Sequence, residues 1–572
     1  MTADVSRVSR RGMLKMLVAA GLVGLGPADK LLAAPQQGMA SGNLKASPEP
    51  PAGTPVADFV DLAAQAGLTA KVVIGGERSK QYILETTGGG VALFDYNNDG
   101  WLDIFLVNGW RAGGFPPGSE PTNHLYRNNH DGTFTDVTEA AGLIHHGWGQ
   151  GVCVGDYDHD GNLDLFVTYY GKNVLYHNNG NGTFTDVTAK SGLLTAENLY
   201  STGAAFFDYD RDGHLDLFVS HYTIYEDATR FGLGSEKGCH YDGLPVFCGP
   251  RGLRGATNTL YRNNGDGTFT DVSKKAGLAT DGHFGFSPLV LDYDNDGWPD
   301  VYVADDSTAS LLFHNNRDGT FTEIGSLAGV GFSEDGREQG GMGVAAGDYD
   351  GDGFLDIVKT NFDADTSSLY RNRGDGTFDD NTFASGIGRN TKFVGWGVGF
   401  IDFDNDGWPD IFMANGHVYP EIDKASADAS YLQRKILYRN NHDGKFDDVS
   451  LRAGPGIQLK RSSRGVAFGD LFNTGHTDIL VNNMNEAPTL LHNFKTYEHR
   501  SVTFRLVGKD PNRFALGARV IVRTGTLHMM NEVRSGGSYL SQDDLRLRFG
   551  LGDAIKADKV EIHWPDGKVD ML

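Results

Sequence analysis

The chain lacks the residues and segments that several large classes of protein require. It has only 3 cysteines in 572 residues, and no Cys-x-x-Cys-His motif that would attach haem covalently. Its formal charge is −24, from 50 Lys and Arg against 74 Asp and Glu, which argues against a nucleic-acid partner, because such a partner would require a basic face. A Ser–His–Asp order, a phosphate loop and a nucleotide fingerprint are also missing. These absences argue against a redox haem protein, a nucleic-acid partner and a nucleotide enzyme.

A long apolar run is missing too, and the short one near the start has a different meaning. Arg10 and Arg11 form a twin-arginine pattern, and residues 16–26 are apolar but too few to span a bilayer comfortably. We expect residues 1–40 to be a bacterial export signal, with an uncleaved anchor as the alternative. Residues 41–58 are predicted to be a Pro-rich linker. The mature chain is expected to have no transmembrane span and to be periplasmic or secreted.

The few cysteines divide into a pair and a single residue. Cys239 and Cys248 bracket a short loop inside an insertion at residues 221–258, and in an oxidising periplasm they would pair as a disulfide. Two free thiols are the alternative. Cys153 lies in an apolar strand and is expected to be a small buried hydrophobe.

What the chain has in abundance is repetition. Three patterns recur in a fixed order: an acidic loop, a strand ending in Leu-Tyr-Arg-Asn-Asn, and a segment of the type Asp-Gly-Thr-Phe-Thr-Asp-Val-Thr. Periods of this size indicate a solenoid or a propeller, and short strands between Gly- and Asn-rich turns favour the propeller. The acidic loops begin at Asp95, Asp156, Asp208, Asp292, Asp348, Asp402 and, in a decayed copy, Asp470.

The number of copies of each pattern predicts how the repeat array closes. Seven acidic loops and seven Leu-Tyr-Arg-Asn-like strands are followed by only six Gly-Thr-Phe segments, and the missing copy lies at residues 59–68. A strand from the N-terminus would therefore complete the last blade and remove an exposed sheet edge. The prediction is an all-β chain: a seven-bladed β-propeller at 59–496, then a small antiparallel β domain at 497–572.

The acidic loops predict cation sites. Five have the form Asp-x-Asp-x-Asp-Gly-x-x-Asp, and the first has Asn97 at its third position. Oxygens at positions one, three, five and nine, with a backbone carbonyl at seven, suit a hard cation, and Gly at six permits the sharp turn. No His or Cys joins the motif, which disfavours zinc, copper and iron, and these loops offer more protein oxygens than magnesium usually takes. We predict about six structural Ca²⁺ ions, one for each intact loop.

The seventh loop is predicted to bind no ion, because Phe472 and Thr474 stand where oxygen ligands are needed. The predicted ligands in the other loops are Asp95, Asn97, Asp99, Trp101, Asp103, Asp156, Asp158, Asp160, Asn162, Asp164, Asp208, Asp210, Asp212, His214, Asp216, Asp292, Asp294, Asp296, Trp298, Asp300, Asp348, Asp350, Asp352, Phe354, Asp356, Asp402, Asp404, Asp406, Trp408 and Asp410, where the seventh residue of each loop contributes its carbonyl.

These motifs resemble those of known families. The acidic loops after apolar strands resemble the FG-GAP or VCBS repeats of integrin-type propellers. The segments 517–520 (Gly-Ala-Arg-Val), 534–543, 549–552 (Phe-Gly-Leu-Gly) and 564–567 (Trp-Pro-Asp-Gly) resemble an ASPIC/UnbV domain. Together they resemble the cartilage acidic protein family, and that resemblance implies extracellular calcium binding and an adhesion-like role.

A few residues outside the loops are candidates for a functional site. His417 and Tyr419 break the repeat and are weak catalytic candidates, as an acid or base; a hydrogen-bonded loop histidine is the alternative. Asp305, Asp306 and Ser307 could bind a cation or a sugar, or form a solvated loop. The polar loop 534–543 is expected either to form a structural turn or to contact a partner or the propeller.

Three functions fit this sequence. The first is a monomeric binding module for a protein or glycan of the cell envelope. The second is a carbohydrate lyase or hydrolase, which predicts ionisable residues converging at one mouth of the central channel, and the third is a structural scaffold. Because the strands that enter the loops, such as 341–347 and 395–400, are small and apolar, the sequence favours binding over catalysis.

Overall fold

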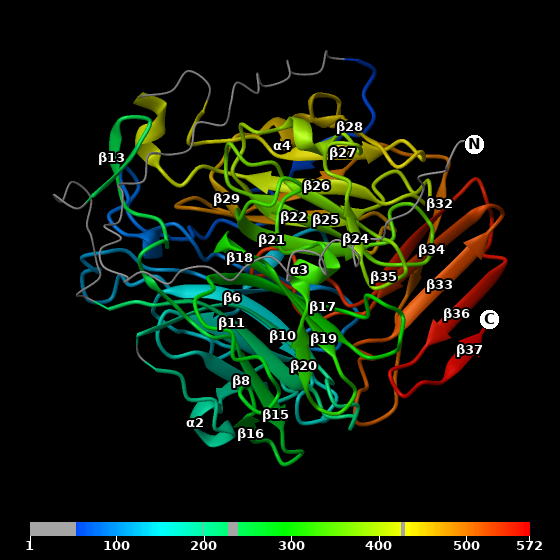
Figure 1. The fold of residues 1–572 in the computed structure, drawn as a ribbon, viewed down its shortest axis with the longest axis horizontal. Coiled ribbons are helices and arrows are strands. Elements are labelled where there is room, and N and C mark those ends of the chain that lie inside the picture. The colour runs from blue at the N-terminus through cyan, green and yellow to red at the C-terminus, as the bar shows by residue number, and fades with distance from the viewer. Residues whose placement is uncertain (1–52, 197, 227–237, 425–428) are drawn as a thin grey trace, which may run out of the picture. The chain divides into compact units, whose positions relative to one another are not determined.

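The fold was obtained as a computed structural model that describes residues 53–572 except 197, 227–237 and 425–428 (Figure 1). The predicted export signal and most of the predicted linker lie outside these residues. The end of the linker segment is not free: Ala57 is 1% exposed and packs in a core cluster with Phe403 and Ile457, and the Val56 N–H donates to the Arg452 carbonyl at 2.9 Å.

Each repeat folds into four antiparallel strands, in which the second strand begins at the last aspartate of the acidic loop. The first strands are β2 (Val91–Phe94), β6 (Gly149–Gly155), β10 (Leu199–Phe207), β17 (Gly285–Leu291), β21 (Gln339–Gly347), β25 (Gly395–Ile401) and β29 (Ser463–Gly469). The second strands are β3 (Asp103–Leu106), β7 (Asp164–Tyr169), β11 (Asp216–Ile224), β18 (Asp300–Thr308), β22 (Asp356–Asn361), β26 (Asp410–Asn415) and β30 (Asp478–Asn483).

The outer half of each repeat comes from the other two sequence patterns. The third strands, which carry the Leu-Tyr-Arg-Asn motif or its variants, are β4 (His124–Asn128), β8 (Val174–Asn178), β15 (Thr259–Asn263), β19 (Leu311–Asn315), β23 (Ser368–Asn372), β27 (Ile436–Asn440) and β31 (Thr489–Asn493). The fourth strands are β5 (Phe134–Asp136), β9 (Phe184–Asp186), β16 (Phe269–Asp271), β20 (Phe321–Glu323), β24 (Phe378–Asp380), β28 (Phe446–Asp448) and β1 (Phe59–Asp61).

The strands assemble into a propeller in which the first and last repeats meet. The first strands contact one another in chain order from β2 to β29, and β29 in turn contacts β2. Strand β1 pairs with β31, Phe59 opposite Asn493, so the N-terminal segment supplies the fourth strand of the last repeat. The first strands are buried throughout or nearly so. Because each first strand packs against the first strands of its neighbours, its side chains must be small and apolar, as they are in the sequence.

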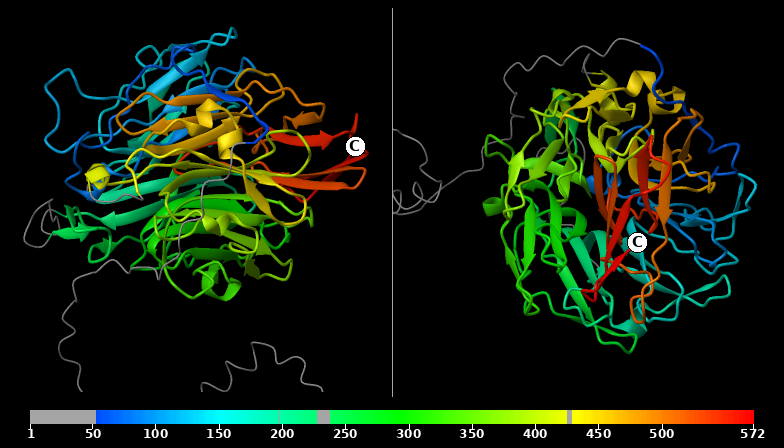
Figure 2. Two further views of the ribbon diagram at one scale, coloured as in Figure 1. Left: turned by 90° about the horizontal axis from the view of Figure 1, so that it is seen from above. Right: turned by 90° about the vertical axis from the view of Figure 1, so that its right-hand side faces the viewer.

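The C-terminal residues form a separate antiparallel β structure (Figure 2). One sheet has the order β34 (Leu527–Glu532), β33 (Arg519–Thr524), β36 (Lys559–His563), β37 (Val569–Met571), and β32 (Arg500–Phe504) pairs with β35 (Leu547–Gly552). Val520 and Val522, two alternate residues of β33, are fully buried, whereas Arg523, the next residue along the strand, is exposed. This period-two pattern is what folds the segment as a half-buried sheet.

Residues 534–543, the central loop, join this C-terminal sheet structure to the inner strands of the propeller. The Gln542 N–H donates to the Val91 carbonyl at 2.9 Å, the Val152 N–H to the Leu540 carbonyl at 3.1 Å, and the Val344 N–H to the Ser538 carbonyl at 2.9 Å. These inner-strand groups point toward the centre and have no neighbouring strand on that side, so the central loop provides hydrogen bonds that a sheet edge otherwise lacks.

Few of the described residues are helical. Short helices lie between the strands: α2 (Thr188–Ser191), α3 (Gly325–Ala328), α4 (Pro455–Gln458), η1 (Ile83–Glu85), η3 (Ile387–Arg389) and η5 (Ser450–Arg452) between repeats, and η4 (Pro420–Lys424) within the sixth repeat. The insertion in the third repeat adds the hairpin β12 (Cys239–Tyr241) and β13 (Leu244–Val246), and β14 (Arg254–Gly255) pairs with β11. In the part of the chain described here, none of the helices has the length and apolar character needed to cross a membrane.

Candidate functional site

The acidic loops share one backbone turn. In the second loop the two carboxylate oxygens of Asp156 accept hydrogen bonds from the N–H groups of Asp160 (3.1 Å) and Gly161 (3.0 Å). The glycine at position six has a φ of 88° in this loop, a left-handed conformation that favours glycine. The Asp-x-x-x-x-Gly part of the motif therefore builds the turn, and the remaining acidic residues are not needed for it.

The seventh loop demonstrates this division of roles within the same chain. Asp470 accepts hydrogen bonds from the N–H groups of Thr474 (2.8 Å) and Gly475 (2.7 Å), so the turn forms without carboxylates at positions three and five. Position three is Phe472, which packs beside the His492 ring at 5.3 Å. The carboxylates at positions three and five of the intact loops are therefore not required for the turn to fold.

Several loop carboxylates, most of them at position three, carry an oxygen without a protein partner. Among the described residues, one buried oxygen in each of five loop aspartates accepts no hydrogen bond: Asp158, Asp208, Asp210, Asp350 and Asp404. A buried polar atom is normally paired, and an unpaired anionic oxygen is costly. Ligand atoms of the second loop (Asp156, Asp158 and Asp160) lie within 4.8 Å of one another, as do those of the third (Asp208, Asp210 and Asp212). The donor set, all oxygen and strongly anionic, fits a hard divalent cation.

The aspartate at position one of several loops has a raised pKa, because it is buried and lies near other carboxylates. Burial, followed by the neighbouring carboxylates, raises the pKa of Asp348 to about 8 and that of Asp402 to about 8. Burial raises the pKa of Asp156 and Asp208 to about 7, although N–H groups of the turn oppose the shift. A bound cation is the charge that would favour the ionised form of these groups.

Basic residues from the third strand also reach the loops, which the sequence analysis missed. Arg262 contacts Asp210 and Asp212, each at 2.7 Å, and Arg439 contacts Asp404 at 2.8 Å. His177 takes this place in the second loop, 3.0 Å from Asp158. The prediction that no His joins the loops is therefore wrong for the second loop, and for the fourth, where His314 lies near Asp294 and Asp296.

The reason for that error is that the histidine comes from a strand distant in sequence from the loop. Since arginine, which cannot bind a metal, occupies the same strand position in the third, fifth and sixth repeats, we assign this position to charge balance. The hydrogen bond to Asp164 raises the pKa of His177 to about 9, which agrees with a cationic side chain there.

A second feature missed from the sequence links each loop to the next repeat. The buried Asp216, at position nine, accepts a hydrogen bond from the Asn263 N–H at 2.8 Å, and the Asn263 side chain donates to the carbonyls of Leu215 (3.0 Å) and Tyr157 (2.8 Å). Tyr157 belongs to the loop of the preceding repeat. Equivalent side-chain bonds to the preceding loop are made by Asn178, Asn315, Asn372 and Asn440. The signal was present as the recurring Leu-Tyr-Arg-Asn motif, whose asparagine had no assigned role.

The weak catalytic candidates are buried. His417 is 0% exposed: its Nδ1 accepts the Tyr419 N–H at 3.1 Å and its Nε2 lies 3.3 Å from Asp363. Tyr241, from the hairpin β12–β13, donates its hydroxyl to the same oxygen of Asp363. This geometry makes His417 a hydrogen-bonded loop residue, the alternative stated above.

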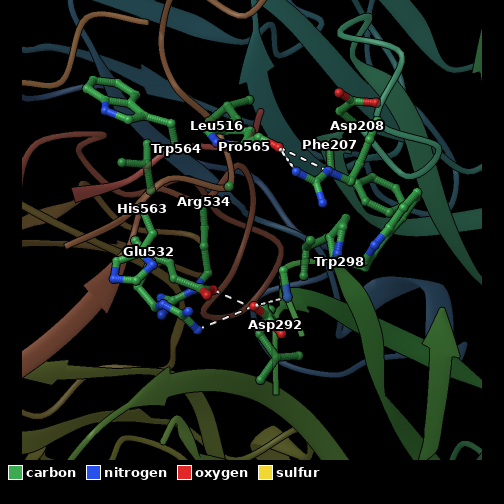
Figure 3. Close-up of a pocket in the computed structure, with 18 of the residues that line it drawn as sticks. Phe207, Asp208, Asp292, Trp298, Leu516, Glu532, Arg534, His563, Trp564 and Pro565 are labelled. Atoms are coloured by element: carbon green, nitrogen blue, oxygen red, sulfur yellow. Dashed lines mark hydrogen bonds and ion pairs between the residues drawn. The ribbon is translucent and has the colours of Figure 1, made fainter. Parts of the chain in front are cut away.

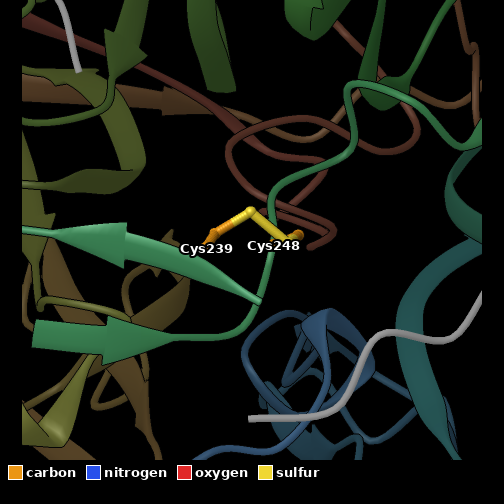
Figure 4. The surroundings of a disulfide bond; sticks show 2 residues. All are labelled: Cys239 and Cys248. Carbon is orange, nitrogen blue, oxygen red and sulfur yellow. A yellow bond between two sulfur atoms is a disulfide. The ribbon is translucent and has the colours of Figure 1, made fainter. Parts of the chain in front are cut away.

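The inserted hairpin is tied by a disulfide between Cys239 and Cys248 (Figure 4). The segment that follows, from Phe247 to Arg251, lines a cavity of about 230 Å³ together with Tyr419, Asp306 and Ser307. The structure therefore brings together residues that the sequence marked separately, and Cys153 is buried apart from them.

A different cleft lies where two acidic loops face the C-terminal sheet structure, with Asp208 and Asp292 on one side and Trp564 on the other (Figure 3). Arg519 reaches Asp292 at 3.3 Å, and the Arg211 guanidinium donates to the Pro565 carbonyl at 2.6 Å. The first residue of the fourth loop is thereby in direct contact with the C-terminal part of the chain.

Two family models match the chain in agreement with this architecture. The FG-GAP-like repeat matches residues 95–167, 156–219, 242–303 and 292–359, and ASPIC and UnbV matches residues 508–572. The chain is an FG-GAP repeat protein with an ASPIC/UnbV domain. The predicted resemblance and the all-β fold class are confirmed, and the first five acidic loops, from Asp95 to Asp356, fall inside the matched repeats.

Curated relatives of this FG-GAP/ASPIC protein are vertebrate proteins. It is 28% identical over 275 residues to cartilage acidic protein 1 of Mus musculus, a match covering 47% of this chain and 40% of the relative. The Homo sapiens protein of the same name is 29% identical over 275 residues, covering 47% and 39%. The match thus spans less than half of the length of these relatives.

Solved structures align with the FG-GAP/ASPIC protein at low similarity. An Agrocybe aegerita lectin whose title concerns recognition of non-reducing terminal N-acetylglucosamine has a TM-score of 0.37 and 17% identity, covering 70% of this chain and 87% of the lectin. The V. cholerae biofilm matrix protein Bap1 has a TM-score of 0.30 and 11% identity, covering 90% and 62%.

Proposed function

We propose that this protein is an exported, calcium-stabilised propeller that acts as an adhesion-like module, binding a protein or glycan of the cell envelope. The observation that carries the calcium part is the contrast between loops. Asp470 of the seventh loop has both oxygens occupied by turn N–H groups, whereas the second, third, fifth and sixth loops each hold a buried carboxylate oxygen without a partner among the described residues. About six Ca²⁺ ions would be held by the aspartates of the intact loops and by Asn97, and would supply charge balance and cross-linking.

Binding is favoured over catalysis by the way the centre of the propeller is filled. Tyr539 and Gln542 of the central loop are 0% exposed, and the loop bonds to inner strands from several repeats. The weak catalytic candidate His417 has both ring nitrogens occupied and no exposed surface. These contacts support a module that recognises its partner with loops and outer surface, and the burial of His417 removes the acid–base candidate that the lyase or hydrolase alternative named.

Thermal unfolding tests the calcium part of the proposal. The mature protein is compared in millimolar calcium, after chelation, and after chelation followed by magnesium. A site occupied at one hundred times its Kd stabilises the folded state by about 2.7 kcal/mol, so loss of several ions should lower the midpoint by many degrees. We expect calcium and not magnesium to restore it. An unchanged midpoint after verified metal removal would contradict the proposal.

The binding part is tested by capture from bacterial envelope extract in calcium and in chelator. We expect a specific protein or glycan to be retained in calcium and released by chelator, and the purified protein to sediment as a monomer. Formation of a small-molecule product from an envelope polysaccharide in the same assay would instead support the enzyme.

Fractionation of a cell carrying Arg10→Lys/Arg11→Lys should show the protein retained in the cytoplasm if the twin-arginine route is used.

A further inference from the structure

Position four of the acidic loops is neither a turn residue nor a predicted ligand, yet it has one backbone conformation throughout. The φ angle at this position lies between 49° and 72° in all seven loops, although six of the seven residues are not glycine. A left-handed conformation is uncommon outside glycine. In five loops the side chain at position four contacts the next loop around the propeller, as the following contacts show.

Two of these contacts are hydrogen bonds made by asparagine. Asn98 of the first loop donates to the Asn162 side-chain oxygen at 2.9 Å and to the Gly161 carbonyl at 3.4 Å, both in the second loop. Asn295 of the fourth loop donates to the Gly353 carbonyl of the fifth at 2.9 Å. The acceptors lie at positions six and seven, next to the carbonyl predicted to bind the ion. Each bond therefore joins the ligand-bearing segments of two loops.

Two further contacts use other side chains at the same position. His159 of the second loop places its Nε2 2.6 Å from the Nδ1 of His214, at position seven of the third loop. Arg211 of the third loop lies over the ring of Trp298, at position seven of the fourth, with its guanidinium carbon 5.1 Å from the ring centroid. These four contacts connect the first five loops in series.

The series ends at the fifth loop. Gly351, at its position four, has no side chain to reach the sixth loop. Asn405, at position four of the sixth loop, accepts a hydrogen bond from Arg548 of the ASPIC/UnbV domain at 2.9 Å. Asn473 of the seventh loop donates to the Gly100 carbonyl at 3.2 Å, but the seventh loop is predicted to bind no ion. The sixth loop is thus the intact loop that the series leaves out.

The position of these contacts couples neighbouring ion sites. An ion in one loop would fix positions three and five, and with them the side chain at position four between these ligands. An ion in the next loop would fix the partner at positions six and seven. Because the contact orders both segments, the second ion would lose less conformational entropy on binding than the first. From the modest net value of one such contact we expect about a fivefold gain in affinity at each link.

Electrostatics opposes this coupling, and salt separates the two effects. Each intact loop has at least three aspartates, so it remains anionic with one Ca²⁺ bound, but filling it reduces the negative charge that attracts the next ion. This longer-range effect is screened beyond about 3 Å in 1 M salt. The direct contacts between loops should be much less affected, so coupling through them should persist at high salt.

We propose that the first five loops load calcium cooperatively, because the side chains at position four couple each ion site to the next, and that the sixth loop loads independently. This inference rests on the proposed calcium sites. It adds that most of the ring becomes ordered over a narrow range of calcium concentration, as a calcium-responsive module requires.

Calcium content measured over a series of chelator-buffered free calcium concentrations tests the proposal. Metal-stripped, full-length mature protein is used, in about 0.15 M and about 1 M KCl. We expect a Hill coefficient of about 2 at both salt concentrations, since a fivefold factor at four successive links steepens the loading curve. A coefficient of 1 or less in 1 M KCl would overturn the proposal.

Substitutions at position four identify the contacts as the cause. Asn98→Gly/Asn295→Gly removes two links while glycine keeps the positive φ, and should lower the Hill coefficient to about 1.5. The matched control is Asn405→Gly, which removes the same side chain from a loop outside the series and should leave the coefficient unchanged. Cooperative folding of the whole propeller would steepen loading equally in these variants. Equal coefficients in the two variants would therefore refute coupling through position four.

Removal of a whole ion site gives a second measurement. Asp210→Asn/Asp212→Asn in the third loop interrupts the series at its middle, so the remaining ions should need about two- to fivefold more calcium for half-loading. Asp404→Asn/Asp406→Asn in the sixth loop should leave half-loading of the others unchanged. Equal shifts would overturn the series.

The same titration separates this proposal from the function on which it rests. Calcium ions that bind independently would remove the coupling and keep the calcium-stabilised propeller. Absence of bound calcium would overturn both.

Discussion

At the scale of single residues, the asparagine of the third strand joins neighbouring repeats. Asn263 makes one bond to the buried Asp216 of its own repeat and one to Tyr157 of the preceding repeat, and it is 1% exposed. Removing its amide would leave the carbonyls of Tyr157 and Leu215 buried without donors. An unsatisfied buried group of this kind costs about 1–3 kcal/mol.

Asn263→Ala should therefore lower the free energy of unfolding by about 2–4 kcal/mol, since two carbonyls lose their donor. Thermal or urea unfolding in saturating calcium measures this loss. The adjacent exposed Asn264, whose side chain bonds only the exposed hydroxyls of Thr268 (2.9 Å) and Thr270 (3.1 Å), provides the matched control: Asn264→Ala should cost less than about 1 kcal/mol. Similar losses for the two variants would show that the bond between repeats contributes little.

At the scale of the element, an acidic loop is one turn with two separable parts. Asp at position one and Gly at position six close the turn in the second loop and in the seventh alike. Positions three and five decide whether the turn also offers oxygen ligands. Ion binding should then be transferable between loops by exchanging only those two positions.

Calcium content of the purified protein, measured by mass spectrometry after equilibrium dialysis, tests this transfer. Asp350→Asn/Asp352→Asn in the fifth loop should lower the content by about one ion per chain, because two anionic ligands are lost. Phe472→Asp/Thr474→Asp should raise it by about one, since the seventh loop already has the turn. A content unchanged by both pairs of substitutions would show that these positions do not bind the ions.

The sequence predicted the elements that repeat and missed the contacts between them. The loops, the strand order and the strand at Phe59–Asp61 could be predicted because each copy of a motif places its turn residues at fixed offsets. The approach of Arg262 or His177 to a loop could not, because strand and loop are about twenty to fifty residues apart and only the folded sheet brings them together. The meeting of Asp306, Tyr419 and Arg251 around one cavity depends on packing between different repeats, for which a single sequence has no periodic signal.

At the scale of the whole molecule, the central loop holds the ASPIC/UnbV domain against the propeller. Its Gln542 accepts hydrogen bonds from Val154 N–H (3.2 Å) and Gly536 N–H (2.8 Å), and it donates to the Asp543 carbonyl at 2.8 Å. Ser535 adds a bond to the Val154 carbonyl at 2.7 Å. The loop thereby satisfies inner-strand groups that have no other partner on that side, so the two parts of the chain should unfold together.

Gln542→Ala tests this coupling, because it removes a fully buried side chain and leaves the Val154 N–H without its acceptor. We expect a loss of about 2–4 kcal/mol from the unpaired groups and the cavity, together with faster proteolysis between the propeller and the ASPIC/UnbV domain. The exposed Lys556→Ala in the same domain is the control and should change neither. A wild-type midpoint and cleavage rate for Gln542→Ala would mean that the domain is held by its contacts with the acidic loops, such as Arg519 with Asp292, and not by the central loop.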